Sequence, residues 1–353
     1  MDLGDLRTRI NDLDNQILLL LNQRAEAVLQ IGDLKRRQES PSYVPEREVE
    51  IIRRLKALSR GPLAHDAVDA IWREVLSACR NLEHPLTVSY LGPPATFTHQ
   101  VALGRFGSAV RYQPARNIVE VFEDVERQRV DQGVVPVENS TGGAVSVTLD
   151  RLIESTVLIS GELYLDVAQY LLSRARDLGE ITRVVSHPQG LAQCRAWIAR
   201  HLPEVLTEEM ASTAAAAELA ASDATVAAIA SELAGQHYGV PVLRARIEDD
   251  QNNTTRFLLL GRHPVGPTGR DKTSILFAMR NEPGALYRIL EPFARAGVNL
   301  TKIESRPAKH RPWEYVMFVD FEGHRETSVV AGALAEIGER TLFLKILGSY
   351  PAA

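Results

Sequence analysis

The stretch GVVPVENSTGG at residues 133–143 joins a short apolar run to a polar, glycine-containing cluster. Other short apolar runs stand at residues 87–91 (TVSYL) and 182–186 (TRVVS), and stretches with helical periodicity separate these runs. Strands that alternate with helices are typical of an α/β fold. We therefore predict a central α/β domain at residues 86–262.

Two changes of composition mark the chain beyond residue 210. An alanine-rich stretch at 211–234 contains one strand-like run at 225–229 (TVAAI), which predicts a buried strand between two helices of small residues. A linker rich in proline and glycine, GRHPVGPTG, follows at residues 261–269. Residues 272–350 then show the pattern β, α, β, β, α, β, which predicts a ferredoxin-like α+β module.

The N-terminal part of the chain has helical periodicity. Residues 3–34 carry apolar side chains at alternating steps of three and four, which indicates one long helix with a heptad seam. A second helix is predicted to begin near Pro45, and a third amphipathic helix covers about residues 65–83. We predict an all-α helical domain at residues 1–85, and the protein is therefore expected to be multidomain.

Composition and charge argue against several kinds of partner. Hydrophobic residues make up 45% of the 353 residues, and the net charge of -5 provides no basic field for nucleic acid or an anionic membrane. Cys79 and Cys194 are far apart, which argues against a disulfide framework or a thiolate zinc site and favours a reducing, cytoplasmic setting. We expect no cofactor, and no metal ion, because His99 and His187 do not stand at metal-ligand spacing.

Three cations of the first predicted helix form a candidate anion site. Arg24 occupies a core position of the heptad, where an unpaired charge costs stability, so we expect an anion to meet it. Lys35 returns to nearly the same face of the helix. Arg7 lies about 25 Å from Arg24 along the helix axis, so only an antiparallel partner helix brings it to the site, which then requires a dimer. Alternatively, Arg7 and Lys35 are solvated and Arg24 forms an internal ion pair.

Short motifs mark the helical domain: LR at 6–7, LD at 13–14, LL at 20–21, QR at 23–24 and PERE at 45–48. In this order they resemble the all-helical chorismate mutase of bifunctional plant and bacterial enzymes. The resemblance implies that Arg24 and the partner's Arg7 hold two carboxylates, Lys35 the ether oxygen, and Arg47 and Glu48 the hydroxyl end of the substrate. The rearrangement needs no acid, base or metal, because holding the reactive conformer and stabilising charge on the ether oxygen suffice.

Glu83 departs from the bacterial mutase pattern, which often has glutamine there to donate a hydrogen bond to the ether oxygen. An ionised carboxylate has no proton to donate and repels a developing negative charge. Glu83 must then be protonated during turnover, and we expect mutase activity to fall as the pH rises. The alternative is that Glu83 merely ends the third helix in solvent.

Polar clusters follow the predicted strands of the α/β domain. They stand at residues 96–99, 138–143, 186–189, 212–213 and 254–257. Ligands bind beyond the carboxyl ends of strands in open α/β sheets, so these clusters are predicted to form one site. Hydroxyls, amides and glycines without a lysine-bearing phosphate loop favour a small oxyanion over a nucleotide. Taken singly, each cluster is more typical of a helix cap.

Taken together, the motifs of this domain are specific. They are LGP at 91–93, VPVENS at 135–140, SHPQ at 186–189 with QCR at 193–195, and NTTRF at 253–257. In this order they closely resemble prephenate dehydratase. The resemblance implies two α/β lobes of periplasmic-binding-protein type, which the chain crosses twice, with the substrate in the cleft.

The same resemblance implies roles for individual residues. Thr255 is expected to hydrogen-bond the departing hydroxyl, while Arg256 pairs with a carboxylate or braces the loop. Glu138 is a candidate proton donor, with an orienting role equally open. Phe97 and Phe257 are candidates for an apolar wall that favours decarboxylation by keeping water from the charge. The residues expected to position the substrate are Asn139, Ser186, Gln193 and Thr213.

Two motifs lie at turns of the C-terminal module: PGAL at 283–286 and IESRP at 303–307. At this spacing they resemble the ACT regulatory domain, in which both motifs are associated with phenylalanine binding. The resemblance implies that such domains pair edge to edge with the effector at the interface. The candidate effector residues are Gly284, Ala285, Leu286, Glu304, Ser305 and Arg306.

The order of the three resemblances predicts a bifunctional enzyme of phenylalanine biosynthesis. It rearranges chorismate to prephenate and converts prephenate to phenylpyruvate, with inhibition by phenylalanine, and it forms a homodimer or a higher homo-oligomer. Two alternatives stay open at this point. One is a dehydratase that prefers arogenate, and the other is a non-catalytic sensor that binds a small ligand between its lobes.

Overall fold

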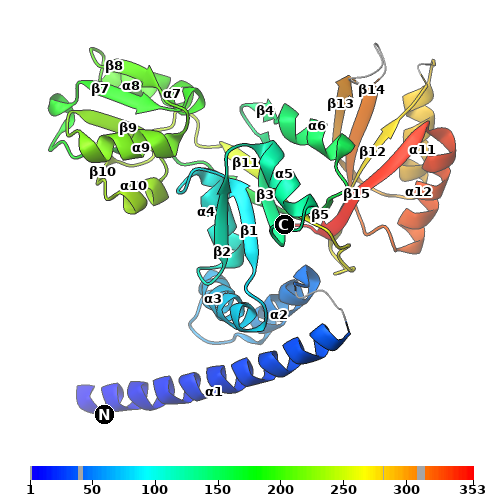
Figure 1. The fold of residues 1–353 in the computed structure, drawn as a ribbon, viewed down its shortest axis with the longest axis horizontal. Coiled ribbons are helices and arrows are strands. Elements are labelled where there is room, and N and C mark those ends of the chain that lie inside the picture. The colour runs from blue at the N-terminus through cyan, green and yellow to red at the C-terminus, as the bar shows by residue number, and fades with distance from the viewer. Residues whose placement is uncertain (1, 39–42, 281, 308–314) are drawn as a thin grey trace. The chain divides into compact units, whose positions relative to one another are not determined.

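The computed structural model describes residues 2–38, 43–280, 282–307 and 315–353. The chain forms two compact units. The helical unit ends at Thr87 and includes the segment Arg105–Arg111, and the α/β unit comprises Val88–Gly104 and Tyr112–Ala353. Figure 1 labels the helices and strands of both units. Among the helices described, none combines the length and apolar character that crossing a membrane requires.

Three helices build the helical unit, as the sequence predicts. They are α1 (Leu3–Arg37), α2 (Pro45–Leu58) and α3 (His65–Glu83). The side chain of Asp2 accepts from the backbone N–H of Asp5, and Asp5 returns the bond, so a capping box fixes the start of α1. Both α1 and α2 pack against α3. The all-helical prediction is therefore confirmed.

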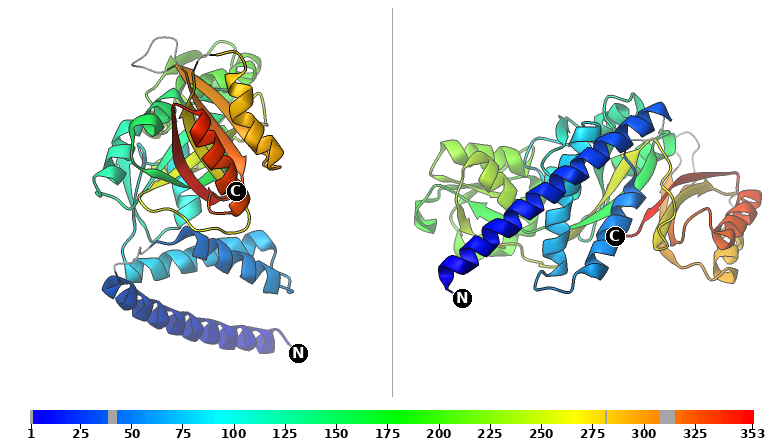
Figure 2. Two further views of the ribbon diagram at one scale, coloured as in Figure 1. Left: turned by 90° about the vertical axis from the view of Figure 1, so that its right-hand side faces the viewer. Right: turned by 90° about the horizontal axis from the view of Figure 1, so that it is seen from below.

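Helix α1 is one continuous helix (Figure 2). The side chains of its heptad seam are exposed. Leu13 is 48% exposed and Leu20 is 62% exposed, although both occupy core positions of the seam. Gly32 is the one buried residue of α1 in the described part of the chain. An apolar stripe of this length is typical of an association surface.

The first lobe of the α/β unit contains a sheet in the order β2-β1-β3-β11-β5, with β4 paired to β3. Strand β1 runs parallel to β3, whereas β11 is antiparallel to both β3 and β5. Its strands are β1 (Thr87–Leu91), β2 (Arg111–Ala115), β3 (Gln132–Asn139), β4 (Gly143–Ala144), β5 (Leu158–Asp166) and β11 (Thr254–Gly261). Its helices are α4 (Phe97–Phe106), α5 (Ile118–Glu126) and α6 (Ser146–Glu154).

The second lobe contains a sheet in the order β10-β6-β9-β7-β8. Its strands are β6 (Tyr170–Leu172), β7 (Arg183–Ser186), β8 (Leu206–Glu209), β9 (Val226–Ala230) and β10 (Val242–Arg244). Its helices are α7 (Pro188–Gln193), α8 (Arg195–His201), α9 (Thr213–Ser222) and α10 (Glu232–Tyr238), with a short 3₁₀ turn at Leu178–Glu180. The buried strand β9 lies between α9 and α10 in sequence, as predicted for the alanine-rich stretch, although α10 extends beyond that stretch to Tyr238 and includes larger residues.

The chain crosses between the lobes twice. It enters the second lobe between β5 and β6 and returns to the first sheet with β11 (Figure 1). The backbone N–H of Val167 donates to Asn253 O at 2.7 Å, so the two crossing segments are bonded to each other. The two-lobed prediction is therefore confirmed.

The C-terminal module has the predicted β, α, β, β, α, β order. Its elements are β12 (Asp271–Ala278), α11 (Ala285–Arg295), β13 (Leu300–Pro307), β14 (Tyr315–Glu322), α12 (Ser328–Arg340) and β15 (Phe343–Pro351). The antiparallel sheet has the order β13-β14-β12-β15, and α11 and α12 cover one of its faces (Figure 1). The ferredoxin-like prediction is confirmed.

The other face of the C-terminal sheet shares a core with the first lobe. Phe318 and Leu347 of the module belong to the same buried cluster as Leu258 and Ile159 of the lobe. A Cβ on Gly348 would overlap the backbone of Ile159, so β15 approaches β5 at a distance that only glycine permits. The module and the lobe are therefore packed as one unit.

Candidate active sites

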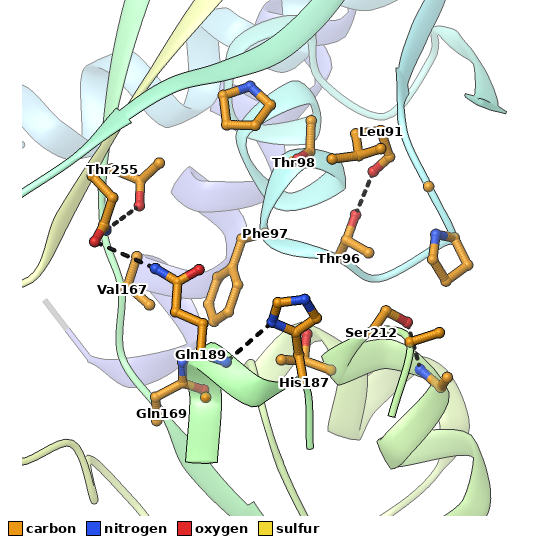
Figure 3. Close-up of a pocket in the computed structure, with 18 of the residues that line it drawn as sticks. Leu91, Thr96, Phe97, Thr98, Val167, Gln169, His187, Gln189, Ser212 and Thr255 are labelled. Carbon is orange, nitrogen blue, oxygen red and sulfur yellow. Dashed lines mark hydrogen bonds between the residues drawn. The ribbon is translucent and has the colours of Figure 1, made fainter. Parts of the chain in front are cut away.

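A cavity of about 490 Å³ lies between the two lobes (Figure 3). Such a volume is typical of a small-molecule site. Its walls come from the ends of β1, β3 and β11, the crossing segment before β6, and the starts of α4, α7 and α9. The predicted residues that line it are Asn139, Gln193, Thr213 and Thr255, together with Phe97 and Phe257. All five predicted polar clusters contribute residues to the cavity, but the cluster at 254–257 lies at the amino end of the antiparallel strand β11 and not beyond a carboxyl end as predicted.

Asn139 and Thr255 form the central contact of this cavity. They are direct partners in the β3–β11 register, and Asn139 Nδ2 donates to Thr255 Oγ1 at 2.8 Å. Asn139 Oδ1 accepts from the backbone N–H of Gly142 at 2.8 Å, which fixes the amide. Because Oγ1 accepts the hydrogen bond from Asn139, the Thr255 hydroxyl still has its own proton to donate. No side chain in the described part of the protein accepts that proton.

Two glutamine amides meet at the other side of the cavity. Gln169 Nε2 donates to Gln193 Oε1 at 2.9 Å, which leaves the Gln193 amide hydrogens available to a ligand. Gln169 is 2% exposed, and its Oε1 has no hydrogen-bond partner among the described residues. A buried acceptor without a partner is uncommon and marks a position for a ligand or water. Sequence reasoning missed Gln169 because it lies in a crossing segment without a motif.

The helix starts of the second lobe also face the cavity. Thr213 is the first residue of α9, and Ser212 Oγ caps this helix by accepting from Ala215 N. The amino end of a helix carries a partial positive charge that favours an anionic ligand. His187 Nδ1 accepts from the backbone N–H of Gln189 at the start of α7, and both of these residues line the cavity. The polar clusters therefore serve as helix caps and as cavity walls together.

Two other predicted residues do not line the cavity. Ser186 is fully buried, and its hydroxyl donates to Ile229 O at 2.6 Å across the second sheet. Glu138 precedes Asn139, and neighbouring strand residues point to opposite faces. Its carboxylate therefore turns away and pairs with Lys302 of β13 at 2.7 Å.

Arg256 is the third predicted residue outside the cavity lining. It is buried and pairs with Glu162 of β5 at 2.8 Å and with Asp320 of β14 at 2.5 Å, while Tyr350 Oη accepts from it at 3.1 Å. Burial opposes its charge, but Tyr350, Asp320 and Glu162 hold the pKa of Arg256 above its usual value. Arg256 therefore connects the first lobe to the C-terminal module, a contact that the sequence did not predict.

The helical unit brings part of its predicted site together. Arg24 lies 5.8 Å from the ring of Trp72, and its Nη1 is buried without a hydrogen-bond partner among the described residues. Lys35 Nζ lies 2.9 Å from Glu83 Oε1, and the Glu83 side chain is only 10% exposed. Glu83 therefore does not end α3 in solvent. Arg7 lies on the exposed N-terminal half of α1.

Arg47 and Glu48 point in different directions from the start of α2. Arg47 is on the surface and pairs with Glu50 at 2.5 Å. Glu48 is buried and pairs with Arg80 at 3.0 Å and Arg105 at 3.4 Å. Arg105 lies far along the sequence, so spacing within the predicted helices gave no sign of this pair.

Of the two motifs of the C-terminal module, the first lies at the start of α11 and the second on the edge strand β13. Gly284 is the N-cap of α11, and its φ of 75° lies in the left-handed region that favours glycine. On the edge strand β13, Ser305 is paired with Met317 of the helix-covered face, whereas Glu304 and Arg306 point to the opposite face. Arg306 pairs there with Asp150 of α6 at 3.1 Å.

Comparisons with protein families match the chain in three consecutive parts. The model of chorismate mutase type II matches residues 6–84, and that of prephenate dehydratase matches residues 88–265. The model of the ACT domain matches residues 273–339. The predicted order of the three resemblances is therefore confirmed.

Individual relatives agree with these matches. The bifunctional chorismate mutase/prephenate dehydratase of Aquifex aeolicus is 47% identical over 356 residues, with 100% of this chain and 98% of the relative covered. The structure of a prephenate dehydratase from Arthrobacter aurescens in complex with L-Phe is 36% identical, covers 75% of this chain and 90% of that one, and has a TM-score of 0.70. A structure described as a novel type of quorum quenching acylase, GqqA, is 31% identical, covers 76% of this chain and 98% of that one, and has a TM-score of 0.69. The chain belongs to the family of bifunctional chorismate mutase/prephenate dehydratases with a C-terminal ACT domain.

Proposed function

We propose that this chain rearranges chorismate to prephenate in the helical unit and converts prephenate to phenylpyruvate in the cavity between the lobes. The observation that carries the second assignment is the Thr255 hydroxyl, which Asn139 holds in the cavity wall. The free, buried thiols of Cys79 and Cys194 fit a reducing compartment, and we place the protein in the cytoplasm.

In the dehydratase step, the bond between the ring and its carboxylate breaks and its electron pair enters the ring. The ring becomes aromatic as the hydroxyl leaves, and the step takes up one proton from the solvent to form water, so carbon dioxide and water are the other products. Thr255 donates a hydrogen bond to the departing oxygen. Phe97 and Phe257 keep water from the ring carboxylate, which favours its loss.

Other cavity residues position the substrate. The amide of Gln193 and the start of α9 at Thr213 supply hydrogen-bond donors to its carboxylate and carbonyl oxygens. Asn139 positions the substrate through Thr255, because its amide hydrogens are donated to Thr255 Oγ1 and Asn253 Oδ1. Ser186 acts indirectly. Its hydroxyl is bonded to the backbone of β9, and this bond fixes the end of β7, which leads into α7. Glu138 has the orienting role, since its pair with Lys302 holds the end of β3 that presents Asn139.

The mutase site is completed by a second copy of the chain. Arg24 offers a buried Nη1 with no hydrogen-bond partner among the described residues, and Lys35 stands beside Glu83 for the ether oxygen. The exposed seam of α1 pairs with the same seam of the partner, in antiparallel order, and delivers the partner's Arg7. An ether bond breaks as a carbon–carbon bond forms, and Lys35 stabilises the charge on the oxygen. Arg47 and Glu48 are proposed at the hydroxyl end.

Phenylalanine is the proposed inhibitor, bound at the C-terminal module. The solved relative from Arthrobacter aurescens was crystallised with L-Phe, and this chain matches 90% of it. The turn at Gly284–Leu286 and the edge residues Glu304–Arg306 supply the proposed contacts. Because β13 is an edge strand, two modules pair along it and enclose the effector.

Turnover by the full-length protein tests this function. Chorismate is added to the purified chain, and prephenate and then phenylpyruvate are followed by absorbance. Prephenate and arogenate are then compared side by side as substrates of the second step. We expect both products and a higher kcat/KM for prephenate. Saturable binding without turnover would support a sensor instead, and a preference for arogenate would correct the substrate.

A further inference from the structure

The loop at residues 92–96, between β1 and α4, contacts both the cavity and the buried core. Gly92, Pro93 and Thr96 line the cavity between the lobes. Ala95, in the same loop, is fully buried and has φ of 66°, in the left-handed region that L-residues rarely adopt. Such a conformation persists only where surrounding contacts hold it.

Ala95 belongs to the core of the opposite lobe. The loop comes from the first lobe, but Ala95 packs in a buried cluster of the second lobe whose alanines are Ala216, Ala217, Ala220, Ala228, Ala230 and Ala234. Its carbonyl accepts from the hydroxyl of Ser231, the cap residue of α10, at 3.3 Å. The loop is therefore a latch that joins the lobes beside the cavity.

His99 holds this latch from the first lobe. Its Nδ1 accepts from the backbone N–H of Ala95 at 3.0 Å, so Nδ1 carries no proton. The imidazole stacks on Tyr90, with centroids 4.5 Å apart and an interplanar angle of 10°, and meets Tyr112 edge-on at 5.4 Å. These rings leave the imidazole one orientation, with Nδ1 toward the loop.

We propose that His99 is a positioning residue for the dehydratase reaction, whose neutral imidazole keeps the 92–96 loop latched between the lobes. The proposal rests on the proposed function of the cavity. His99 itself is not among the residues that line the cavity, so it acts through Gly92, Pro93 and Thr96.

The surroundings of His99 favour its neutral form. The groups that face it are Tyr90 of β1, Tyr112 of β2 and His237 of α10, and Tyr238 of α10 interacts with Tyr90. Burial, and then the charge of His237, lower the pKa of His99 below the usual histidine value. Protonation at acid pH places a hydrogen on Nδ1, so Ala95 N–H loses its acceptor and the latch opens. Dehydratase activity should therefore fall on the acid side.

Variants of the full-length protein test the latch through the pH profile of the dehydratase. His99→Leu removes the acceptor and should raise KM for prephenate about fivefold, the effect of one hydrogen bond, with a smaller change in kcat. His99→Asn places Oδ1 on the same Cγ as Nδ1 and cannot be protonated. This variant should retain most activity and lose the acid limb of the profile, which is the fall in dehydratase activity at acid pH. His237→Gln removes the opposing charge and should move the acid limb to higher pH.

Three controls accompany these variants. Mutase activity of each variant reports that the chain is folded, and His201→Asn alters an exposed histidine on α8 and should keep the wild-type profile. Thr255→Ala tests the cavity itself: full dehydratase activity in this variant would overturn the proposed function, whatever His99 does. With Thr255→Ala inactive, an unchanged KM in His99→Leu, an unchanged acid limb in His99→Asn, or no acid limb in the wild type would overturn the latch alone.

Discussion

Thr255 and Arg256 are neighbours on β11 that serve opposite sides of the strand. Thr255 Oγ1 accepts from Asn139 in the cavity wall, whereas Arg256 pairs with Asp320 of the C-terminal module. Successive strand residues point to opposite faces, so this division follows from the strand itself. The module therefore contacts β11 one residue away from the proposed catalytic hydroxyl.

Loss of Arg256 should destabilise the α/β unit. Arg256→Ala leaves the buried carboxylates of Glu162 and Asp320 without this partner, and breaking such a pair costs about 3–5 kcal/mol. Chemical denaturation of the full chain measures the loss. Arg116→Ala is the matched control, because Arg116 is on the surface and should leave the midpoint unchanged. Equal midpoints for the two variants would contradict a stabilising brace.

Inhibition by phenylalanine should depend on the pair between Lys302 and Glu138. Lys302 lies on β13 two residues before Glu304, and Glu138 precedes Asn139, so the pair connects the effector strand to the cavity. Lys302→Gln should raise the half-inhibitory concentration of phenylalanine by about fivefold or more, within the usual range of allosteric coupling.

The control for Lys302→Gln is Arg295→Gln, which removes a surface cation of α11 and should leave inhibition unchanged. Deletion of the module is a poor substitute for these variants. It would uncover the core that Leu258 shares with Phe318 and leave Glu162 and Arg256 without Asp320. Unaltered inhibition in Lys302→Gln would place the coupling elsewhere.

The mutase reaction should slow as the pH rises. Glu83 pairs with Lys35, and only a protonated Glu83 donates to the ether oxygen of the substrate. Glu83→Gln supplies a permanent donor and should carry activity to higher pH, as kcat/KM profiles would show. Glu74→Gln makes the same change on the same helix and serves as the control. Superimposable profiles for wild type and Glu83→Gln would exclude Glu83 as the donor.

Two inactive mutase variants should complement each other. Arg7→Ala and Arg24→Ala remove residues that the proposed dimer takes from different chains. Heterodimers then contain one intact site and one site that lacks both arginines. Mixed and purified heterodimers should recover up to about half of the wild-type mutase activity, as expected from one of two sites in a symmetric dimer. No recovery in verified heterodimers would show that both arginines serve the same chain's site.

Much of the fold follows from local patterns in the sequence. The run before Glu138 has the length and β-branched content of a strand, and the polar residues after it lie at the strand end, where the cavity forms. Asn139 and Thr255 could therefore be placed in one site before their contact was known.

Other features depend on contacts between distant segments, which the periodicity of a segment does not encode. Arg256 follows Thr255 in a motif, but its direction depends on a sheet that packs against β11 from the next module. Glu48 meets Arg105 only in the folded helical unit. Gln169 lies in a crossing segment with no repeat or motif, so nothing in the sequence distinguished it from a linker residue.

The most direct test of two separate active sites in one chain measures both reactions in the same two variants. Arg24→Ala should lower mutase kcat/KM about 100-fold or more and leave the dehydratase near wild type. Thr255→Ala should lower dehydratase kcat about 100-fold or more and leave the mutase intact, with Thr255→Ser retaining most of the activity. Parallel loss of both reactions in either folded variant would contradict separate sites.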